Sequence, residues 1–231
     1  MDYDVTDYDL MPNLEDILPF EDGEQRTPCV LLLDTSSSMC GAPISELNDG
    51  LQVFKRELMD DVIARRRVEV SIITFGGKVD LVQDFVTAEE FQPPHLSASG
   101  RTPIGEAIDR ALDRVAMQVS LYERAGVPQT KPWVFLMSDG APTDDWQRAA
   151  ERVQRRATEL AFFSVGIGHA NMNTLARIAP AERPPLRLDG LKFSELFEWL
   201  RRSLKSCSQA PAGQQAALPS PEKWAKGWGQ A

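Results

Sequence analysis

The stretch "CVLLLDTSSSMCG" (residues 29–41) decides the fold of this chain. Its first half is a short, continuous apolar run, which is typical of a strand that is buried on both faces. The run ends on Asp34, and Ser36 and Ser38 follow at alternate positions. Side chains two residues apart in an extended segment point the same way, so we expect these three oxygen-bearing groups to share one face. A buried strand that ends on such a group indicates a binding site at the edge of a sheet.

Apolar residues recur along the rest of the chain with the periods of strands and helices. Steps of three and four between apolar residues predict amphipathic helices, and short apolar or alternating runs predict strands. The strands are predicted over 29–34, 68–75, 79–85, 132–139, 161–168 and 185–189, and the helices over 43–65, 104–124, 144–159, 171–178 and 193–204.

This alternation predicts the α/β class: a doubly wound, Rossmann-like, mostly parallel six-stranded sheet with helices on both faces. One antiparallel edge strand is expected at 79–85, because that segment follows a Gly-Gly turn and is polar on one face. In such sheets the ligand site lies beyond the carboxyl ends of the strands, where the strand order reverses. Asp34 and Asp139 each end a predicted strand, so both are expected at that edge.

Composition divides the chain into an acidic N-terminal arm (1–26), one domain (27–208) and a C-terminal tail (209–231). The arm carries nine acidic residues and one arginine, a net −8 out of the −9 of the whole chain, which leaves −1 for the remainder. It is either a flexible, solvated segment or an arm that docks on a partner or on the domain. The tail is an Ala/Pro/Gln linker followed by Trp224 and Trp228, which either pack on the domain or bind a partner.

The composition argues against several classes of protein. No apolar run approaches the ~20 residues that span a membrane, and the first residues, "MDYDVTDYDL", lack the basic and apolar regions of a signal peptide. No basic stripe is evident, so a nucleic-acid partner is not expected. The three cysteines have no CxxC spacing and fit free thiols in a reducing compartment, so we expect a cytoplasmic protein.

Three predicted loops at the sheet edge supply oxygen ligands. The first offers Asp34, Ser36 and Ser38, the second offers Thr102 in "SGRTPIGEAI", and the third offers Asp139 in "LMSDGAPTD". Two carboxylates and three hydroxyls, with no His or Cys, favour Mg²⁺, with Mn²⁺ or Ca²⁺ as alternatives, over zinc or copper. The two carboxylates balance a divalent charge, and an open coordination position would accept an Asp or Glu of a protein partner. Alternatively, Asp34 only orients a loop and the serines are turn residues.

These three segments, in this order, resemble the metal-ion-dependent adhesion site (MIDAS) of von Willebrand factor type A (VWA) domains, and the resemblance covers roughly residues 28–206. The details are most similar to the bacterial TerY-like branch from tellurite-resistance regions, in "LLLDTSSSMCGAPISELNDGL", "ITFGGKV", "SASGRTPIGEAI" and "LMSDGAPTDDW". The resemblance implies that the three hydroxyls are direct metal ligands and that the two carboxylates lie close, often through water. It also implies a stress-response or defence role beside kinase and phosphatase partners.

An enzyme is the less favoured interpretation. Phosphatases of the haloacid dehalogenase type also end their first strand on Asp, but they need a second Asp where this chain has Ser36. The chain has no GxxxxGK[ST] phosphate loop, and neither His95 nor His169 is placed to form a Ser-His-Asp triad. We therefore predict a protein–protein interaction module without catalytic activity. The alternative is a structural or self-associating subunit whose metal site only stabilises it.

Charged residues near the predicted ligands have simpler expected roles. Arg101 precedes Thr102 and either steers an acidic partner or is solvated. Asp144 and Asp145 are expected to cap the helix predicted over 144–159 at its N-terminus. Self-association would need only the acidic arm, which could supply a carboxylate to the metal of another copy.

Overall fold

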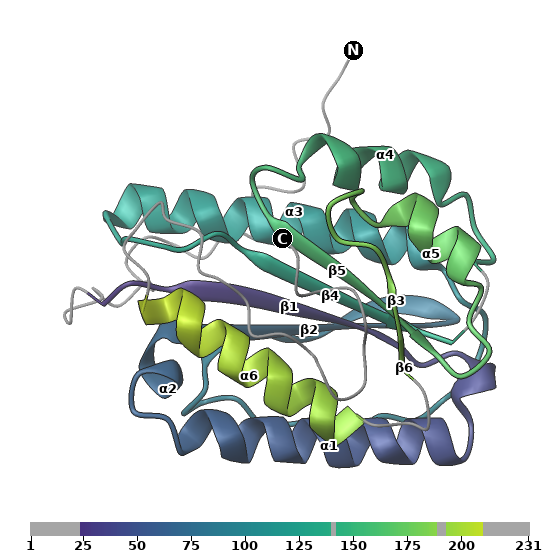
Figure 1. Cartoon of the computed structure of the whole chain (residues 1–231), viewed down its shortest axis with the longest axis horizontal. Coiled ribbons are helices and arrows are strands. Elements are labelled where there is room, and N and C mark those ends of the chain that lie inside the picture. Colours follow the sequence, from purple (N-terminus) through teal and green to yellow (C-terminus); the bar gives the residue numbers. More distant parts are fainter. Residues whose placement is uncertain (1–23, 140–141, 189–192, 210–231) are drawn as a thin grey trace.

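Six strands form one mixed sheet between two layers of helices (Figure 1). The computed structural model describes residues 24–139, 142–188 and 193–209. The strands lie in the order β3-β2-β1-β4-β5-β6, with β2 and β3 antiparallel and all other neighbours parallel. The predicted fold class is confirmed. The strands are β1 (Thr27–Asp34), β2 (Val68–Gly76), β3 (Lys78–Thr87), β4 (Trp133–Ser138), β5 (Ala161–Ile167) and β6 (Leu186–Leu188).

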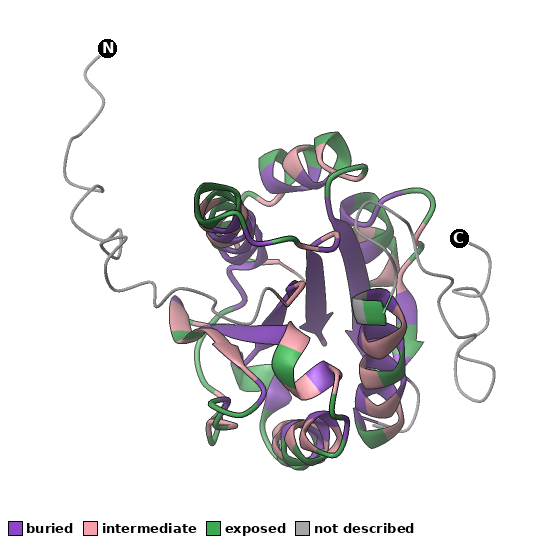
Figure 2. Ribbon diagram, turned by 90° about the vertical axis from the view of Figure 1, so that its left-hand side faces the viewer, coloured by how far each residue is buried: buried purple, intermediate pink, exposed green. Residues whose placement is uncertain are grey.

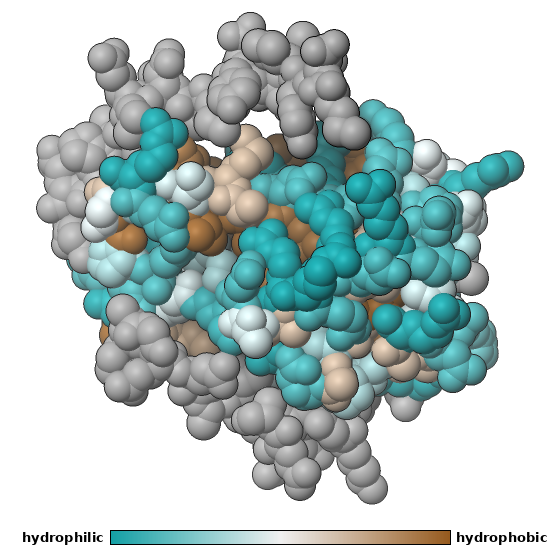
Figure 3. Space-filling view, turned by 90° about the horizontal axis from the view of Figure 1, so that it is seen from above, coloured by the Kyte–Doolittle hydropathy of each residue, from teal (hydrophilic) through white to brown (hydrophobic). Residues whose placement is uncertain are grey.

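The helices cover both faces of the sheet, and the strands between them are largely buried (Figure 2). Seen from above, the face that carries α3, α4 and α5 is mainly hydrophilic (Figure 3). None of the helices in the described part of the chain combines the length and the apolar character needed to cross a membrane. One layer contains α1 (Ala42–Met59), α2 (Ala64–Arg67) and α6 (Phe193–Gln209), and the other contains α3 (Ile104–Ala125), α4 (Gln147–Arg155) and α5 (Met172–Ile178).

β1 lies centrally in the sheet because both of its faces are apolar. Leu31 and Leu33 belong to the core cluster under α1 and α6, whereas Val30 and Leu32 belong to the cluster under α3, α4 and α5. All four side chains are fully buried. The continuous apolar run in the sequence therefore reflects a strand with two covered faces.

The helix predicted over 43–65 is wrong only at its C-terminal end. α1 ends at Met59, and a separate turn of helix, α2, begins at Ala64. Between them the Asp61 carboxylate accepts hydrogen bonds from two backbone N–H groups, including that of Ala64 at 3.0 Å, and so starts a new helix. Val62, a predicted core position, is therefore 63% exposed.

The helix predicted over 144–159 is shorter than expected, since α4 begins at Gln147 and ends at Arg155. Its N-cap position is held by Trp146, which makes no capping bond. The Asp144 carboxylate, predicted to cap this helix, instead accepts hydrogen bonds from the first turn of α3. The prediction of a local cap is wrong because the sequence does not show that α3 lies next to this loop.

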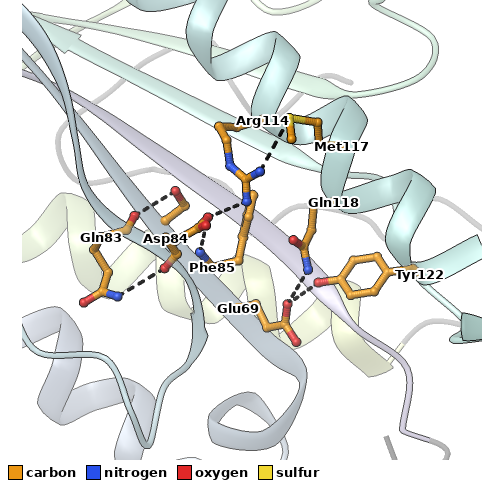
Figure 4. Close-up of polar contacts among 9 residues, drawn as sticks. Glu69, Gln83, Asp84, Phe85, Arg114, Met117, Gln118 and Tyr122 are labelled. Carbon is orange, nitrogen blue, oxygen red and sulfur yellow. Dashed lines mark hydrogen bonds and ion pairs between the residues drawn. The ribbon is translucent and has the colours of Figure 1, made fainter. Parts of the chain in front are cut away.

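A buried polar cluster joins β2 to α3 (Figure 4). The Glu69 carboxylate accepts hydrogen bonds from the Tyr122 hydroxyl and from Gln118 Nε2, the latter at 3.2 Å. Its other oxygen lies 3.6 Å from the Nε of Arg26. Burial raises the pKa of Glu69, and the Tyr122 hydrogen bond and the Arg26 charge offset this effect only in part. This cluster lies where β1 and β2 begin, at the opposite end of the sheet from Asp34.

Candidate functional site

The candidate site lies where the strand order reverses. β1 and β4 are parallel neighbours, with Leu33 opposite Met137, so Asp34 and Ser138 end side by side. The chain then runs from β1 through α1 to β2 on one side, and from β4 through α4 to β5 on the other. The loops after β1 and β4 therefore diverge, and this is the switch point at which doubly wound sheets usually bind their ligands.

Asp34 is held rigidly at the end of β1. One carboxylate oxygen accepts a hydrogen bond from the Ser36 N–H at 2.8 Å, and the other accepts one from the Ser138 hydroxyl at 2.6 Å. Burial nevertheless raises the pKa of Asp34, and the nearby charge of Asp139 adds to that effect. A buried carboxylate that disfavours its own negative charge is suited to a cation at its side.

Ser36, Ser38 and Asp139 form a chain of oxygens next to Asp34. The Ser36 and Ser38 hydroxyl oxygens lie 3.0 Å apart, and the Ser38 hydroxyl donates to Asp139 Oδ1 at 2.7 Å. The two serines share one direction as predicted, although β1 has already ended and a short 3₁₀ turn (Ser37–Met39) carries the second of them. The first and third predicted loops therefore meet at their oxygen atoms.

Thr102 reaches the same edge through the loop before α3. The Ser37 N–H donates to the Gly100 carbonyl at 3.0 Å, and the Gly77 N–H donates to the Arg101 carbonyl at 2.7 Å. Thr102 itself is buried, and within the described residues its hydroxyl makes no hydrogen bond. Backbone hydrogen bonds thus tie the second loop to the first loop and to the turn between β2 and β3, and they leave the Thr102 hydroxyl unused.

Of the other residues predicted to contact a partner, the structure describes only Arg101. The Arg101 side chain is exposed beside Thr102, a position that suits contact with a partner. Trp224 and Trp228 lie outside the described residues, as do the acidic residues of the arm before Glu24.

The side chains at this edge fit a hard divalent cation. Asp34, Ser36, Ser38 and Asp139 present only oxygen, and the hydroxyls of Ser38 and Thr102 can turn their lone pairs toward a cation. No three His, Cys, Asp or Glu side chains in the described ranges are grouped as metal ligands. A cation here would therefore depend on the hydroxyls as well as on the two carboxylates.

Three residues that support this edge did not emerge from the sequence. Ser138 orients Asp34, and Thr143 and Asp144 fasten the third loop to the second. Ser138 could have been found as the last residue of a strand expected beside Asp34. The partners of Thr143 and Asp144 lie about 40 residues away along the chain, and no local pattern indicates them.

The overall fold is shared with several solved structures at low sequence identity. A von Willebrand factor type A protein from Catenulispora acidiphila has a TM-score of 0.60 and 16% identity, over 79% of this chain and 43% of that one. The ArnB paralog VWA2 from Sulfolobus acidocaldarius has a TM-score of 0.54 and 18% identity, over 78% and 45%. Proximal thread matrix protein 1 from the mussel byssus, in a structure with a zinc-occupied MIDAS motif, has a TM-score of 0.54 and 20% identity, over 79% and 48%.

The chain thus spans less than half of the length of these structures. Comparison with curated proteins finds no match. The sequence model of the von Willebrand factor type A domain matches residues 29–187, which includes all or most of every strand and the helices α1 to α5. The chain therefore belongs to the von Willebrand factor type A domain family.

Proposed function

We propose that this chain binds a divalent cation at the end of β1 and β4 and uses it to bind a protein partner. VWA domains mediate protein–protein interactions, and some of them bind divalent metals. The observation that supports the proposal is the contact of the Ser38 hydroxyl with the Ser36 hydroxyl at 3.0 Å and with Asp139 at 2.7 Å, beside the buried Asp34. We expect Mg²⁺, with Mn²⁺ or Ca²⁺ as alternatives, because every donor is a hard oxygen.

The ligand set explains why the partner would offer an acidic residue. Asp34 and Asp139 supply the two negative charges that balance a divalent cation, while the hydroxyls of Ser36, Ser38 and Thr102 add none. A bound cation supplies a positive centre to which an Asp or Glu of the partner can coordinate. The exposed Arg101 adds a further positive charge beside the site, which favours the approach of an acidic surface.

The finer proposals rest on the sequence resemblance to the TerY-like branch. They are a cytoplasmic protein, without catalytic activity, in a bacterial stress-response or defence system, with a kinase or phosphatase of the same system as partner. The sequence stretches around Asp34, Thr102 and Asp139 support them. Phosphatase and ATPase assays with Mg²⁺ test the last point, since turnover that Asp34→Ala abolishes would show an enzyme.

Calorimetric titration of Mg²⁺ into the EDTA-treated protein tests the metal site. Ser38→Ala removes one hydroxyl that bonds Asp139, whereas Ser37→Ala removes an equally exposed neighbour whose side chain makes no hydrogen bond within the described residues. We expect Ser38→Ala to weaken Mg²⁺ binding by about tenfold, because a lost hydrogen-bonding ligand costs roughly 1–2 kcal/mol, and Ser37→Ala to bind like the wild type. Equal binding by both variants would contradict this ligand set.

Co-purification from the native cell, with and without EDTA, tests the use of the cation. A protein that is retained with Mg²⁺ and lost with EDTA or with Asp139→Ala would support the metal-bridged partner. A partner that binds regardless of EDTA and of Asp139→Ala would instead support a structural subunit whose metal site only stabilises it.

A further inference from the structure

α3 begins without a capping side chain of its own. Pro103 occupies the N-cap position and makes no side-chain hydrogen bond. Thr102, one residue earlier, has the hydroxyl type that commonly caps helices, yet that hydroxyl takes no part in capping here. The first turn of a helix has N–H groups that lack partners within the helix, so α3 requires acceptors from elsewhere.

The third loop provides these acceptors. Asp144 Oδ1 accepts a hydrogen bond from the Gly105 N–H at 3.1 Å, and Asp144 Oδ2 accepts one from the Glu106 N–H at 2.9 Å. A carboxylate at a helix N-terminus is also stabilised by the helix dipole. Both oxygens of Asp144 are therefore engaged with α3, which lies almost forty residues earlier in the chain.

Thr143 adds a reciprocal pair of hydrogen bonds to the same junction. Its hydroxyl accepts a bond from the Thr102 N–H at 3.1 Å, and its own N–H donates to the Thr102 carbonyl at 3.0 Å. The fit is close, because a Cβ added at Gly105 would lie 2.8 Å from the Asp145 carbonyl oxygen and from the Cα of Trp146. The loop can thus approach α3 only where α3 has a glycine.

We propose that Thr143 and Asp144 form a clasp that fixes the third loop against the second and so sets the separation between Thr102 and Asp139. The inference rests on the proposed function, because the clasp acts through these two ligands. Asp144 is a positioning residue and not a ligand, since α3 uses both of its oxygens. By capping α3 from another loop, it also leaves the Thr102 hydroxyl available to the site.

Amide hydrogen exchange followed by NMR in EDTA tests the clasp without any metal. The compared variants are Asp144→Ala and Asp145→Ala, which remove the same charge from neighbouring residues. The key amides are those of Thr102 and Thr143, which do not bond Asp144 directly. We expect Asp144→Ala to speed their exchange by about tenfold, because the variant loses two hydrogen bonds to a charged acceptor. Exchange at the same rate in both variants would overturn the clasp.

Titration with Mg²⁺ then tests whether the clasp positions Thr102 and Asp139. We expect Asp144→Ala to lower the affinity about tenfold more than Asp145→Ala does, as is usual when the support of a metal ligand is lost. Thr143→Val should also lower it, whereas Thr143→Ser, which keeps the hydroxyl, should restore it. Equal Mg²⁺ affinities for Asp144→Ala and Asp145→Ala would overturn the positioning role. A wild type that binds no divalent cation would refute the proposed function, while the exchange rates would still decide the clasp.

Discussion

The two carboxylates of the candidate site are not equivalent residues. Asp34 is buried and held by two hydrogen-bond donors, whereas Asp139 is half-buried and bonds the exposed Ser38. Burial raises the pKa of Asp34, which means that the folded protein disfavours its ionised form when no cation is present. The residue is thus kept at a cost in stability that a bound cation would offset.

Asp34→Asn should therefore separate stability from binding. The amide keeps the size of the side chain and can bond both the Ser36 N–H and the Ser138 hydroxyl, so we expect a melting temperature in EDTA at or above that of the wild type. With Mg²⁺ at about 100 times its dissociation constant, the wild type should gain ~2.7 kcal/mol, or roughly 5–10 °C for a chain of this size, and the variant nothing. Differential scanning calorimetry with and without Mg²⁺ gives both values, and a variant that melts well below the wild type in EDTA would contradict this account of Asp34.

At the scale of single elements, the strands were more predictable than the helix ends. Every predicted strand matches an observed one within two residues at each end. Burial on both faces leaves a continuous apolar run in the central strands, and the edge strand β3 shows the alternation of a strand with one exposed face. The sequence did not predict that α1 ends at Met59 or that α4 begins at Gln147. Hydrogen bonds of individual side chains, and not the spacing of apolar residues, determine these two helix ends. Asp61 starts α2 locally, and Asp144 caps a helix that is distant in sequence.

The candidate site likewise combines features that the local sequence predicts with contacts between segments that are distant in the sequence. Asp34, Ser36 and Ser38 could be grouped from their spacing alone. Their proximity to Asp139 could be predicted only from the order of the strands in the sheet, which the alternation of strands and helices indicated in outline. The roles of Ser138 and Thr143 depend on which groups lie opposite them, the Asp34 carboxylate and the Thr102 N–H, and a single sequence does not contain that geometry.

The packing of α1 against α6 depends on Gly50. A Cβ at this position would lie 2.8 Å from Cδ2 of Phe197 and 2.9 Å from Cβ of Phe193. Gly50→Ala should therefore destabilise the protein by roughly 1–3 kcal/mol through overpacking, although alanine favours a helix by about 1 kcal/mol. Urea unfolding measures the loss. Phe197→Leu in the same chain should relieve part of it, and a Gly50→Ala variant as stable as the wild type would show that α6 moves away freely.

The contact of β2 with α3 should make stability depend on pH through Glu69. Because burial raises the pKa of Glu69, its carboxyl group binds a proton more tightly in the folded protein than in the unfolded chain. This tighter binding stabilises the fold fully below about pH 4.3, the ordinary glutamate pKa. The stabilisation is lost as the pH rises through the pKa of the folded state. The difference in unfolding free energy, wild type minus Glu69→Gln, should therefore fall as the pH rises above the ordinary glutamate pKa. Glu123→Gln, an exposed change on the same helix, is the control. A difference that rises instead would mean that the pair with Arg26 dominates.

On the scale of the whole molecule, most of the net charge belongs to the sequence that precedes β1, whereas the candidate site lies at the end of that strand. Residues 1–23 hold eight acidic residues and no basic one, so removing them would change the net charge from −9 to −1. The chain enters the domain at Glu24, which pairs with Arg67 at 2.6 Å near the start of β1, whereas Asp34 lies at its end. Twenty-three extended residues span up to about 80 Å, several times the length of β1, so the acidic segment is long enough to reach the site.

Deletion of residues 1–23 should consequently strengthen the binding of an acidic ligand. The deletion keeps Glu24 and Arg26, whose contacts belong to the domain. A glutamate-containing peptide, titrated in Mg²⁺ at low salt, should bind the shortened chain severalfold more tightly, because eight like charges no longer repel it or compete for the cation. The two chains should converge at 1 M salt, where the Debye length is only about 3 Å. Light scattering on the same samples should give the same number of chains per particle before and after deletion. A number of chains that falls on deletion would contradict this expectation and support self-association through the acidic segment, in which one copy supplies a carboxylate to another.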